Sequence, residues 1–208
     1  MLYLILATII SLSSSLLLIA ISKKIGYLYG PKRNALAVIV STLTGLCLMG
    51  LTLYHIPNIS LKGFFYVQLF NLACMISLSS LFIDLKYKEI PDYFNLATAL
   101  LGGLGTLLYP HTMNQAILLA IGFFALYFLI MVITNAMGGG DVKMVGALGL
   151  FVPFSYAGFF LIAPFAIGSI IAVYLMVIKK QSGKVKIAFG PYIAIAFILT
   201  SFLYWGGF

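Results

Sequence analysis

Charged residues are scarce in this sequence of 208 residues, which contains twelve Lys and Arg but only four Asp and Glu. Charged types make up 8% of the chain, whereas a soluble domain usually carries about 25%. A chain with so few charges cannot cover a water-facing surface, so an ordinary soluble enzyme, a nucleic-acid-binding protein and a disordered protein are excluded. We therefore expect an integral membrane protein that forms a single domain over 1–208.

Cysteine is almost absent as well. The two cysteines, Cys47 and Cys74, lie in separate apolar runs and are far from a Cys-x-x-Cys spacing. This pattern predicts neither a zinc site nor a disulfide framework, and we interpret both as small buried side chains. The sequence gives no indication of a bound metal or of any other cofactor.

Long hydrophobic runs are what the sequence does contain, because hydrophobic types make up 63% of it. A helix that crosses a bilayer needs about 20 apolar residues. The uncharged stretches 93–140 and 144–178 are too long for one helix each, and turn-forming residues interrupt them at 109–114 and 152–155. The sequence has six long uncharged stretches in all. Counting two crossings for each of these two and one for each of the others predicts an all-α membrane bundle of about eight helices. No basic residue precedes the first stretch, 1–22, so we expect no cleavable signal and an N-terminus outside.

The basic residues support this topology. With eight spans, eleven of the twelve Lys and Arg fall in the loops 23–34, 84–92, 135–143 and 179–187, and Lys62 is the exception. Basic residues are retained on the cytoplasmic side of a membrane, so these loops are predicted to face the cytoplasm of a plasma membrane protein. We interpret the net charge of +8 as this orientation signal and expect anionic lipid headgroups, not nucleic acid, beside these loops.

All four acidic residues fall in two of the predicted cytoplasmic loops: Asp84, Glu89 and Asp92 in one, and Asp141 in the other. Each acidic residue has a simple interpretation. Asp84 would be a charge at the membrane boundary that pairs with a nearby lysine, and Glu89 would be a solvated charge. Asp92 and Asp141 would be helix caps. The run Gly138-Gly139-Gly140 before Asp141 is not needed for a cap. It indicates instead the close approach of another backbone or of a substrate.

Two carboxylates at one membrane depth are compatible with three chemistries. The first is acid/base hydrolysis, in which like charges push two pKa values apart so that one carboxyl is protonated and its partner ionised. The second is Mg²⁺ binding, as in a transferase acting on a lipid-linked phosphate, although such sites usually need more oxygen ligands. The third is ion relay in a non-enzymatic transporter, where acids are expected deeper in the bilayer. The confinement of the acids to one face favours hydrolysis.

Three segments resemble motifs of the type IV prepilin peptidase family. Gly138-Gly139-Gly140-Asp141 fits the Gly-x-Gly-Asp motif of membrane aspartic peptidases, and 142–149 is similar to the helix that follows it. In the other family motif an Asp is followed seven residues later by Pro and eight later by Asp or Asn, as in Asp84, Pro91 and Asp92. Phe189-Gly190-Pro191 is similar to a third segment, although Ala188 replaces the preceding proline. The resemblance covers 64–205, the predicted peptidase core, whereas 1–60 supplies two spans of unassigned role.

The resemblance implies an aspartic endopeptidase in which Asp84 and Asp141 activate a water molecule at the cytoplasmic face. Its implied substrate is a type IV prepilin-like precursor, in which a short basic leader precedes an apolar helix. The implied supporting residues are Gly138, Gly139, Gly140, Lys143, Pro91, Asp92, Gly190 and Pro191. Lys143 would hold one carboxylate ionised, or would simply mark the cytoplasmic side. A preflagellin or signal-peptide type of Gly-x-Gly-Asp peptidase remains an alternative.

Many members of this family also carry paired Cys-x-x-Cys motifs in a large first cytoplasmic loop, which is linked to N-methylation of the new N-terminus. Here the first predicted loop, 23–34, is short and contains no cysteine. This departure argues against N-methyltransferase activity in this chain.

Overall fold

The computed structural model describes residues 31–55, 59–135, 137–177 and 188–206, together with four single helical residues before residue 31. Over these ranges the protein is entirely helical, as predicted. The helices are α2 (Pro31–His55), α3 (Leu61–Tyr87), α4 (Asp92–Leu108), α5 (Pro110–Thr134), α6 (Gly139–Gly149), the 3-10 helix η1 (Phe154–Tyr156), α7 (Ala157–Val177) and α8 (Gly190–Trp205). Apart from those four residues, the predicted first span lies outside the described residues, as do most of the basic loops 23–34 and 179–187.

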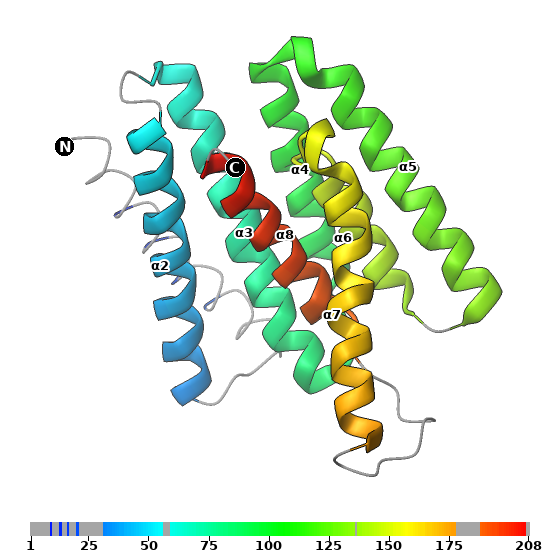
Figure 1. The fold of residues 1–208 in the computed structure, drawn as a ribbon. Coiled ribbons are helices and arrows are strands. Elements are labelled where there is room, and N and C mark those ends of the chain that lie inside the picture. Colours follow the sequence, from blue (N-terminus) through cyan, green and yellow to red (C-terminus); the bar gives the residue numbers. More distant parts are fainter. Residues whose placement is uncertain are drawn as a thin grey trace.

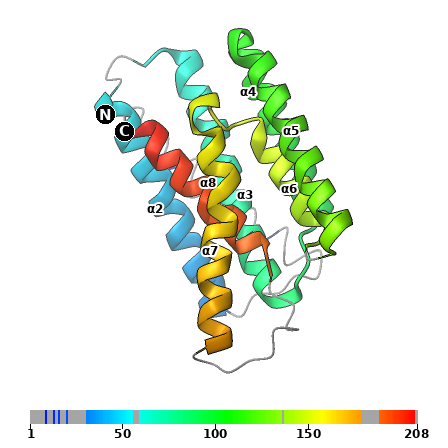
Figure 2. The same ribbon diagram turned by 45° about the vertical axis from the view of Figure 1, so that its right-hand side comes forward.

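Successive helices run in opposite directions, so that alternate loops meet at the same end of the bundle (Figures 1 and 2). The C-terminal end of α3 and the N-terminal ends of α4, α6 and α8 lie together at the lower end in Figure 1. Helix α3 packs against α2, α4 and α8, while α6 packs against α4 and α5. The two acid-bearing loops are therefore neighbours in space, although 57 residues of sequence separate Asp84 from Asp141.

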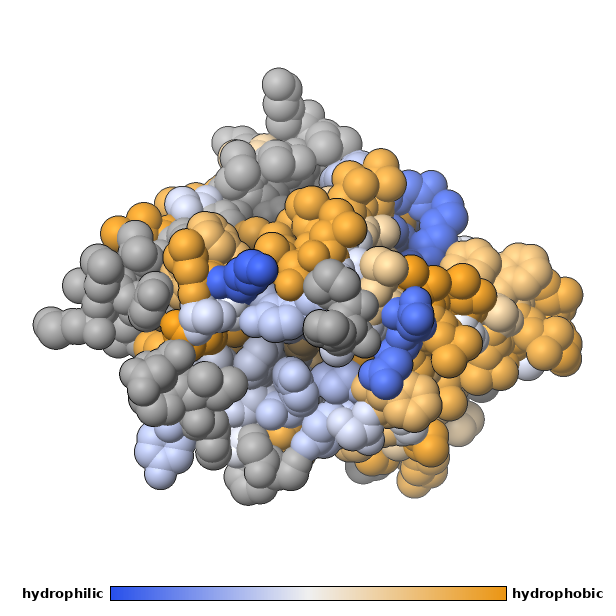
Figure 3. Space-filling view, turned by 90° about the horizontal axis from the view of Figure 1, so that it is seen from above, coloured by the Kyte–Doolittle hydropathy of each residue, from blue (hydrophilic) through white to orange (hydrophobic). Residues whose placement is uncertain are grey.

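Three helical segments are long and apolar enough to cross a membrane: Leu61–Tyr87, Thr112–Thr134 and Phe154–Val177. Large apolar side chains point outward from them, for example Ile121 of α5 and Ile170 of α7, which are 63% and 69% exposed. The space-filling view shows the same pattern, with orange apolar side chains over one side and hydrophilic blue ones in small patches (Figure 3). This surface fits an integral membrane protein. The full set of eight spans and the outside N-terminus remain predictions.

The helical structure breaks at both predicted interruptions of the long apolar stretches, although 110–114 forms the start of α5 and not part of the turn. Helix α4 ends at Leu108 and α5 begins at Pro110, where a proline costs no helical hydrogen bond. Helix α6 ends at Gly149, and Pro153 precedes η1 and α7. With 11 residues, α6 rises about 16 Å, roughly half the thickness of a bilayer core. It is a short helix that reaches into the bundle from the lower end.

The end of α3 explains how Asp84 is placed. The helix starts at a Ser60 cap, whose Oγ accepts a hydrogen bond from the Gly63 N–H, and it continues to Tyr87. Lys88 then takes a left-handed conformation with φ 56°, and its N–H donates to the Asp84 carbonyl oxygen. Asp84 therefore lies in the last turn of a long, packed helix, which fixes its position rigidly.

The two cysteines differ in their surroundings. Cys74 of α3 is buried, as predicted, and its Sγ lies 3.7 Å from the Ser201 Oγ of α8. Cys47 of α2 is exposed, so the prediction of a buried side chain is wrong there. An apolar run predicts a helix but does not reveal which of its faces meets the rest of the bundle.

Candidate active site

A recess of about 550 Å³ opens at the end of the bundle where α3, α4 and α6 meet. All four acidic residues of the chain line it, whereas a single basic residue, Lys88, does so among the described residues. The lining residues are Asp84, Tyr87, Lys88, Glu89, Ile90, Pro91, Asp92, Tyr93, Gly138, Gly139, Gly140 and Asp141. A chain with a net charge of +8 thus gathers its negative charge in one cavity.

Asp84 is buried, with 4% of its surface exposed. Its Oδ2 accepts a hydrogen bond of 2.9 Å from the backbone N–H of Gly190, the first residue of α8. The free N–H groups at a helix N-terminus favour a negative charge, and Pro191 at the second position lacks an N–H there without loss. Asp84 is therefore an interior carboxylate anchored to α8, not an exposed boundary charge.

Asp141 is the third residue of α6 and is 7% exposed. Its Oδ2 accepts a hydrogen bond of 3.0 Å from the Gly138 N–H, so the predicted capping role is present. Its other oxygen, Oδ1, is buried and has no hydrogen-bond partner. Burial raises the pKa of the Asp141 carboxyl to about 7, the Gly138 N–H opposes this, and the nearby Asp84 carboxylate adds to it. This carboxyl can hold a proton near neutral pH.

The three glycines before Asp141 serve different purposes. A Cβ on Gly140 would lie 3.1 Å from both the Cβ and the carbonyl oxygen of Ile90, so this glycine lets α6 approach the backbone of the 84–92 loop. A Cβ on Gly139 would meet nothing within 4 Å. The glycine run was expected to allow the close approach of another backbone or of a substrate. The first reason applies at Gly140, while Gly139 leaves open space in the recess where a substrate would fit.

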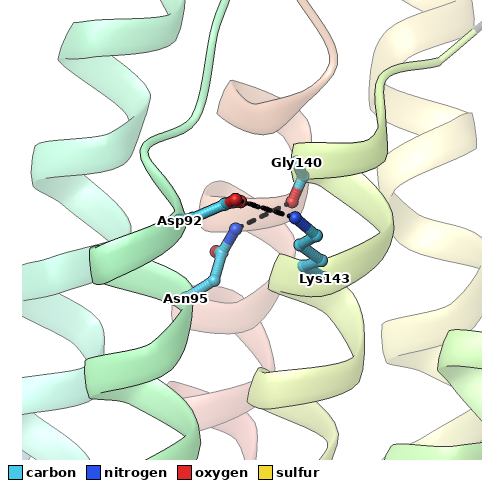
Figure 4. A network of polar contacts seen from close by, with 4 residues as sticks. All are labelled: Asp92, Asn95, Gly140 and Lys143. Atoms are coloured by element: carbon cyan, nitrogen blue, oxygen red, sulfur yellow. Dashed lines mark hydrogen bonds and ion pairs between the residues drawn. The ribbon is translucent and has the colours of Figure 1, made fainter.

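A small polar network joins α4 to α6 beside the recess (Figure 4). The Lys143 Nζ lies 2.8 Å and 2.9 Å from the two carboxylate oxygens of Asp92, and the Asn95 Nδ2 donates to the Gly140 carbonyl oxygen at 3.2 Å. Lys143 therefore pairs with Asp92, so the alternative in which it holds Asp84 or Asp141 ionised is wrong. The other alternative, a residue that marks the cytoplasmic side, stays a prediction.

The predicted cap at Asp92 is wrong, because α4 has Pro91 at its N-cap and no side-chain cap. Asp92 instead lies in the first turn and turns its carboxylate towards α6. Asn95 was missed by sequence reasoning, although it follows Asp92 at a spacing of three, which places both on one face of a helix. Its side chain is 6% exposed.

The donor groups around the recess do not suggest a metal centre. Within the described ranges, no group of three His, Cys, Asp or Glu side chains is arranged to hold a metal ion. The Asp92 carboxylate is engaged by Lys143, and each buried carboxyl already accepts one backbone N–H.

Comparison with known proteins identifies relatives of one kind. A prepilin leader peptidase/N-methyltransferase of Legionella pneumophila is 31% identical over 157 residues, which cover 69% of this chain and 52% of the relative. Proteins of the same name from Xanthomonas campestris and Aeromonas salmonicida are 29% and 30% identical, covering 60% of this chain and 45% of each relative. The chain thus spans about half the length of the curated relatives it matches. No solved structure gives a significant match.

A model of the type IV leader peptidase family matches residues 69–173, just over half of the chain. The matched segment contains both buried aspartates and the glycine run. It runs from the middle of α3 into α7, and so includes every helix end that lines the recess. This chain belongs to the type IV leader peptidase family.

Proposed function

We propose that this protein is an aspartic endopeptidase that removes the short basic leader from type IV prepilin-like precursors at the cytoplasmic face of the membrane. The observation that supports it is the pair of buried carboxylates, Asp84 and Asp141, brought into one recess from two helices. Membership of the leader peptidase family and the names of the relatives point to the same reaction.

The surroundings of the two carboxylates favour different roles for them. We assign the proton to Asp141, whose pKa is raised to about 7 and whose Oδ1 is buried without a hydrogen-bond partner. Asp84, whose Oδ2 accepts the Gly190 N–H, is then the ionised partner. In the proposed reaction a water molecule attacks the scissile carbonyl carbon while one of its protons passes to Asp84. The Asp141 proton moves to the carbonyl oxygen, which gives a tetrahedral diol. The C–N bond then breaks as the proton on Asp84 passes to the leaving nitrogen, and one hydroxyl proton of the diol returns to Asp141, so that the pair regains its single proton. The pair exchanges protons as a unit during each cycle.

The charge of the recess supports a basic leader as the substrate segment. With Asp141 protonated and Asp92 paired with Lys143, Asp84 and Glu89 against Lys88 leave the recess with a small excess of negative charge, which favours a cationic peptide. Gly139 leaves room for an extended backbone beside Asp141. The position of the recess at the end of the bundle supports cleavage at the membrane boundary, where a cytosolic leader would join a membrane-embedded helix.

The proposal is tested by co-expression with a prepilin-like precursor and by a gel shift that separates precursor from product. Wild type should cleave the precursor. Asp84→Asn and Asp141→Asn should each reduce cleavage by at least about 10²-fold, the usual contribution of a general acid or base. Glu89→Gln, compared at saturating precursor so that leader binding does not limit the rate, is the matched control, because Glu89 lines the same recess but is exposed and lies outside the proposed acid/base pair. Normal cleavage by either Asn variant would contradict the assignment of that residue.

The same assay separates the alternatives. A Mg²⁺-dependent transferase would lose its activity in excess chelator, whereas the proposed peptidase should retain full cleavage. A preflagellin or signal-peptide type of peptidase would cleave its own precursor in preference to a prepilin, which a competition between the two substrates reveals. A non-enzymatic transporter would leave every precursor intact in both wild type and variants.

A further inference from the structure

A second cavity, an apolar groove of about 690 Å³, lies between α4, α5 and α6. Its described lining residues are Asp92, Tyr93, Asn95, Leu96, Ala99, Ala120, Ile121, Phe124, Lys143, Gly146, Ala147 and Leu150. Asp92, Asn95 and Lys143 lie near the N-terminal ends of α4 and α6, in the network of Figure 4. The rest of the groove is apolar, with small residues along it and the large exposed side chains of Leu96 and Ile121 at 61% and 63% exposure.

The groove is continuous with the acidic recess. Asp92 and Tyr93 line both cavities, and Lys143, which binds Asp92, lines the groove. The molecule therefore presents a recess lined by four acidic residues that leads, past one exposed ion pair, into an apolar groove between three helices. A polypeptide with a basic extended segment followed directly by an apolar helix would match these two surfaces, with the basic segment in the recess and the helix in the groove.

We propose that the groove between α4, α5 and α6 binds the apolar helix of the substrate while its basic leader occupies the acidic recess. This inference rests on the proposed function, and it specifies where the membrane part of the substrate docks. Helices pack closely in a membrane where small side chains lie at the contact, and Ala99, Ala120 and Ala147 supply such a surface. The Lys143–Asp92 ion pair marks the point at which the substrate passes from recess to groove.

Filling the groove tests this proposal. Ala99→Trp places a large side chain in it, and Ala166→Trp, at an exposed position of α7 away from the groove, is the matched control. Two substrates are compared: a full precursor in proteoliposomes, and a soluble peptide that contains the leader and the scissile bond but lacks the apolar helix. Thermal unfolding in detergent shows whether each variant is folded.

Ala99→Trp should raise KM for the precursor relative to KM for the peptide by about tenfold or more, with little change in kcat, as expected when binding alone is lost. Ala166→Trp should behave as wild type on both substrates. Precursor cleavage by folded Ala99→Trp at the wild-type KM would overturn the proposal. If wild type cleaves neither substrate, the proposed function itself fails, and this result is distinct from the failure of the groove.

Photocrosslinking gives a second test that does not depend on turnover. A photoreactive residue replaces Ile121 in the groove or Ile170 on α7, in an Asp141→Asn background that retains the precursor. The precursor should crosslink through its apolar helix at Ile121 and not at Ile170. Lipid adducts alone at Ile121, with the precursor bound, would show that acyl chains fill the groove and would overturn the proposal.

Discussion

The backbone N–H of Gly190 donates a hydrogen bond of 2.9 Å to the Asp84 Oδ2, joining the start of α8 to the end of α3. This contact needs a glycine. A Cβ at position 190 would lie 2.8 Å from the Asp84 Oδ2 and 2.8 Å from the Ile90 Cδ1. The Phe-Gly-Pro segment near the C-terminus is therefore part of the candidate active site, although more than one hundred residues separate it from Asp84.

Gly190→Ala should impair cleavage strongly, because the added methyl group must displace the Asp84 carboxyl or α8. We expect a loss of at least about 10²-fold in kcat/KM, similar to that of Asp84→Asn, if the carboxyl leaves its position. The assay is precursor cleavage by purified protein in detergent. Gly103→Ala is the control, because a Cβ there meets nothing within 4 Å. Equal activity of the two alanine variants would show that the Gly190 contact is dispensable.

Gly139→Ala and Gly140→Ala should differ in kind. At Gly140 a methyl group meets the Ile90 backbone at 3.1 Å, so this variant should lose stability and activity together. At Gly139 it meets open space, so stability should be kept, while KM for the precursor rises if the substrate backbone lies there. Thermal unfolding and KM, measured on both variants, separate the two effects. Loss of stability in Gly139→Ala would contradict the assignment of open space.

Much of this arrangement could be predicted from the sequence, for identifiable reasons. Charge scarcity and long apolar runs predict a helical membrane protein, and turn residues predict where α4 ends, although α5 begins within the predicted turn. The motif spacing predicts that Asp84 and Asp141 belong together. What could not be predicted was the partner of each polar group, because that depends on how helices rotate about their axes. Of the two roles predicted for Lys143, contact with a catalytic carboxylate is wrong, because its Nζ binds Asp92 of α4.

The Lys143–Asp92 ion pair should contribute little to stability. Its side chains are 51% and 72% exposed, and exposed pairs are worth about 0–1 kcal/mol. Lys143→Met, Asp92→Asn and the double variant should therefore unfold within about 1 kcal/mol of wild type. If the pair positions substrate between recess and groove, KM for the precursor should rise in each variant, with a non-additive effect in the double variant. Additive effects on KM would show that the two side chains act separately.

Asp141 gives the proposed reaction a defined pH dependence. Its pKa is raised from 3.8 to about 7, so the carboxyl stays protonated up to near-neutral pH and ionises above it. Because the mechanism requires one proton on the pair, kcat/KM for the soluble peptide should fall as the pH rises through about 7. A rate that continues to rise above neutral pH would contradict the assignment of Asp141 as the proton donor.

The same pKa shift predicts a change in stability that needs no substrate. A carboxyl whose pKa is raised on folding binds its proton more tightly in the folded state. Its contribution to stability is therefore complete below a pH of about 4 and is lost as the pH rises through about 7. Asp141→Asn cannot ionise, so its Tm relative to wild type should rise over this range and level off above it.

Thermal unfolding in detergent at a series of pH values measures this difference in Tm between Asp141→Asn and wild type. The expected change corresponds to a few kcal/mol at most, because each unit of pKa shift is worth about 1.4 kcal/mol. Glu89→Gln serves as the control, since Glu89 lines the same recess but is exposed. A difference in Tm that stays constant with pH would show that Asp141 is no harder to ionise in the folded protein than in the unfolded chain, and the proton would then have to be assigned to another group.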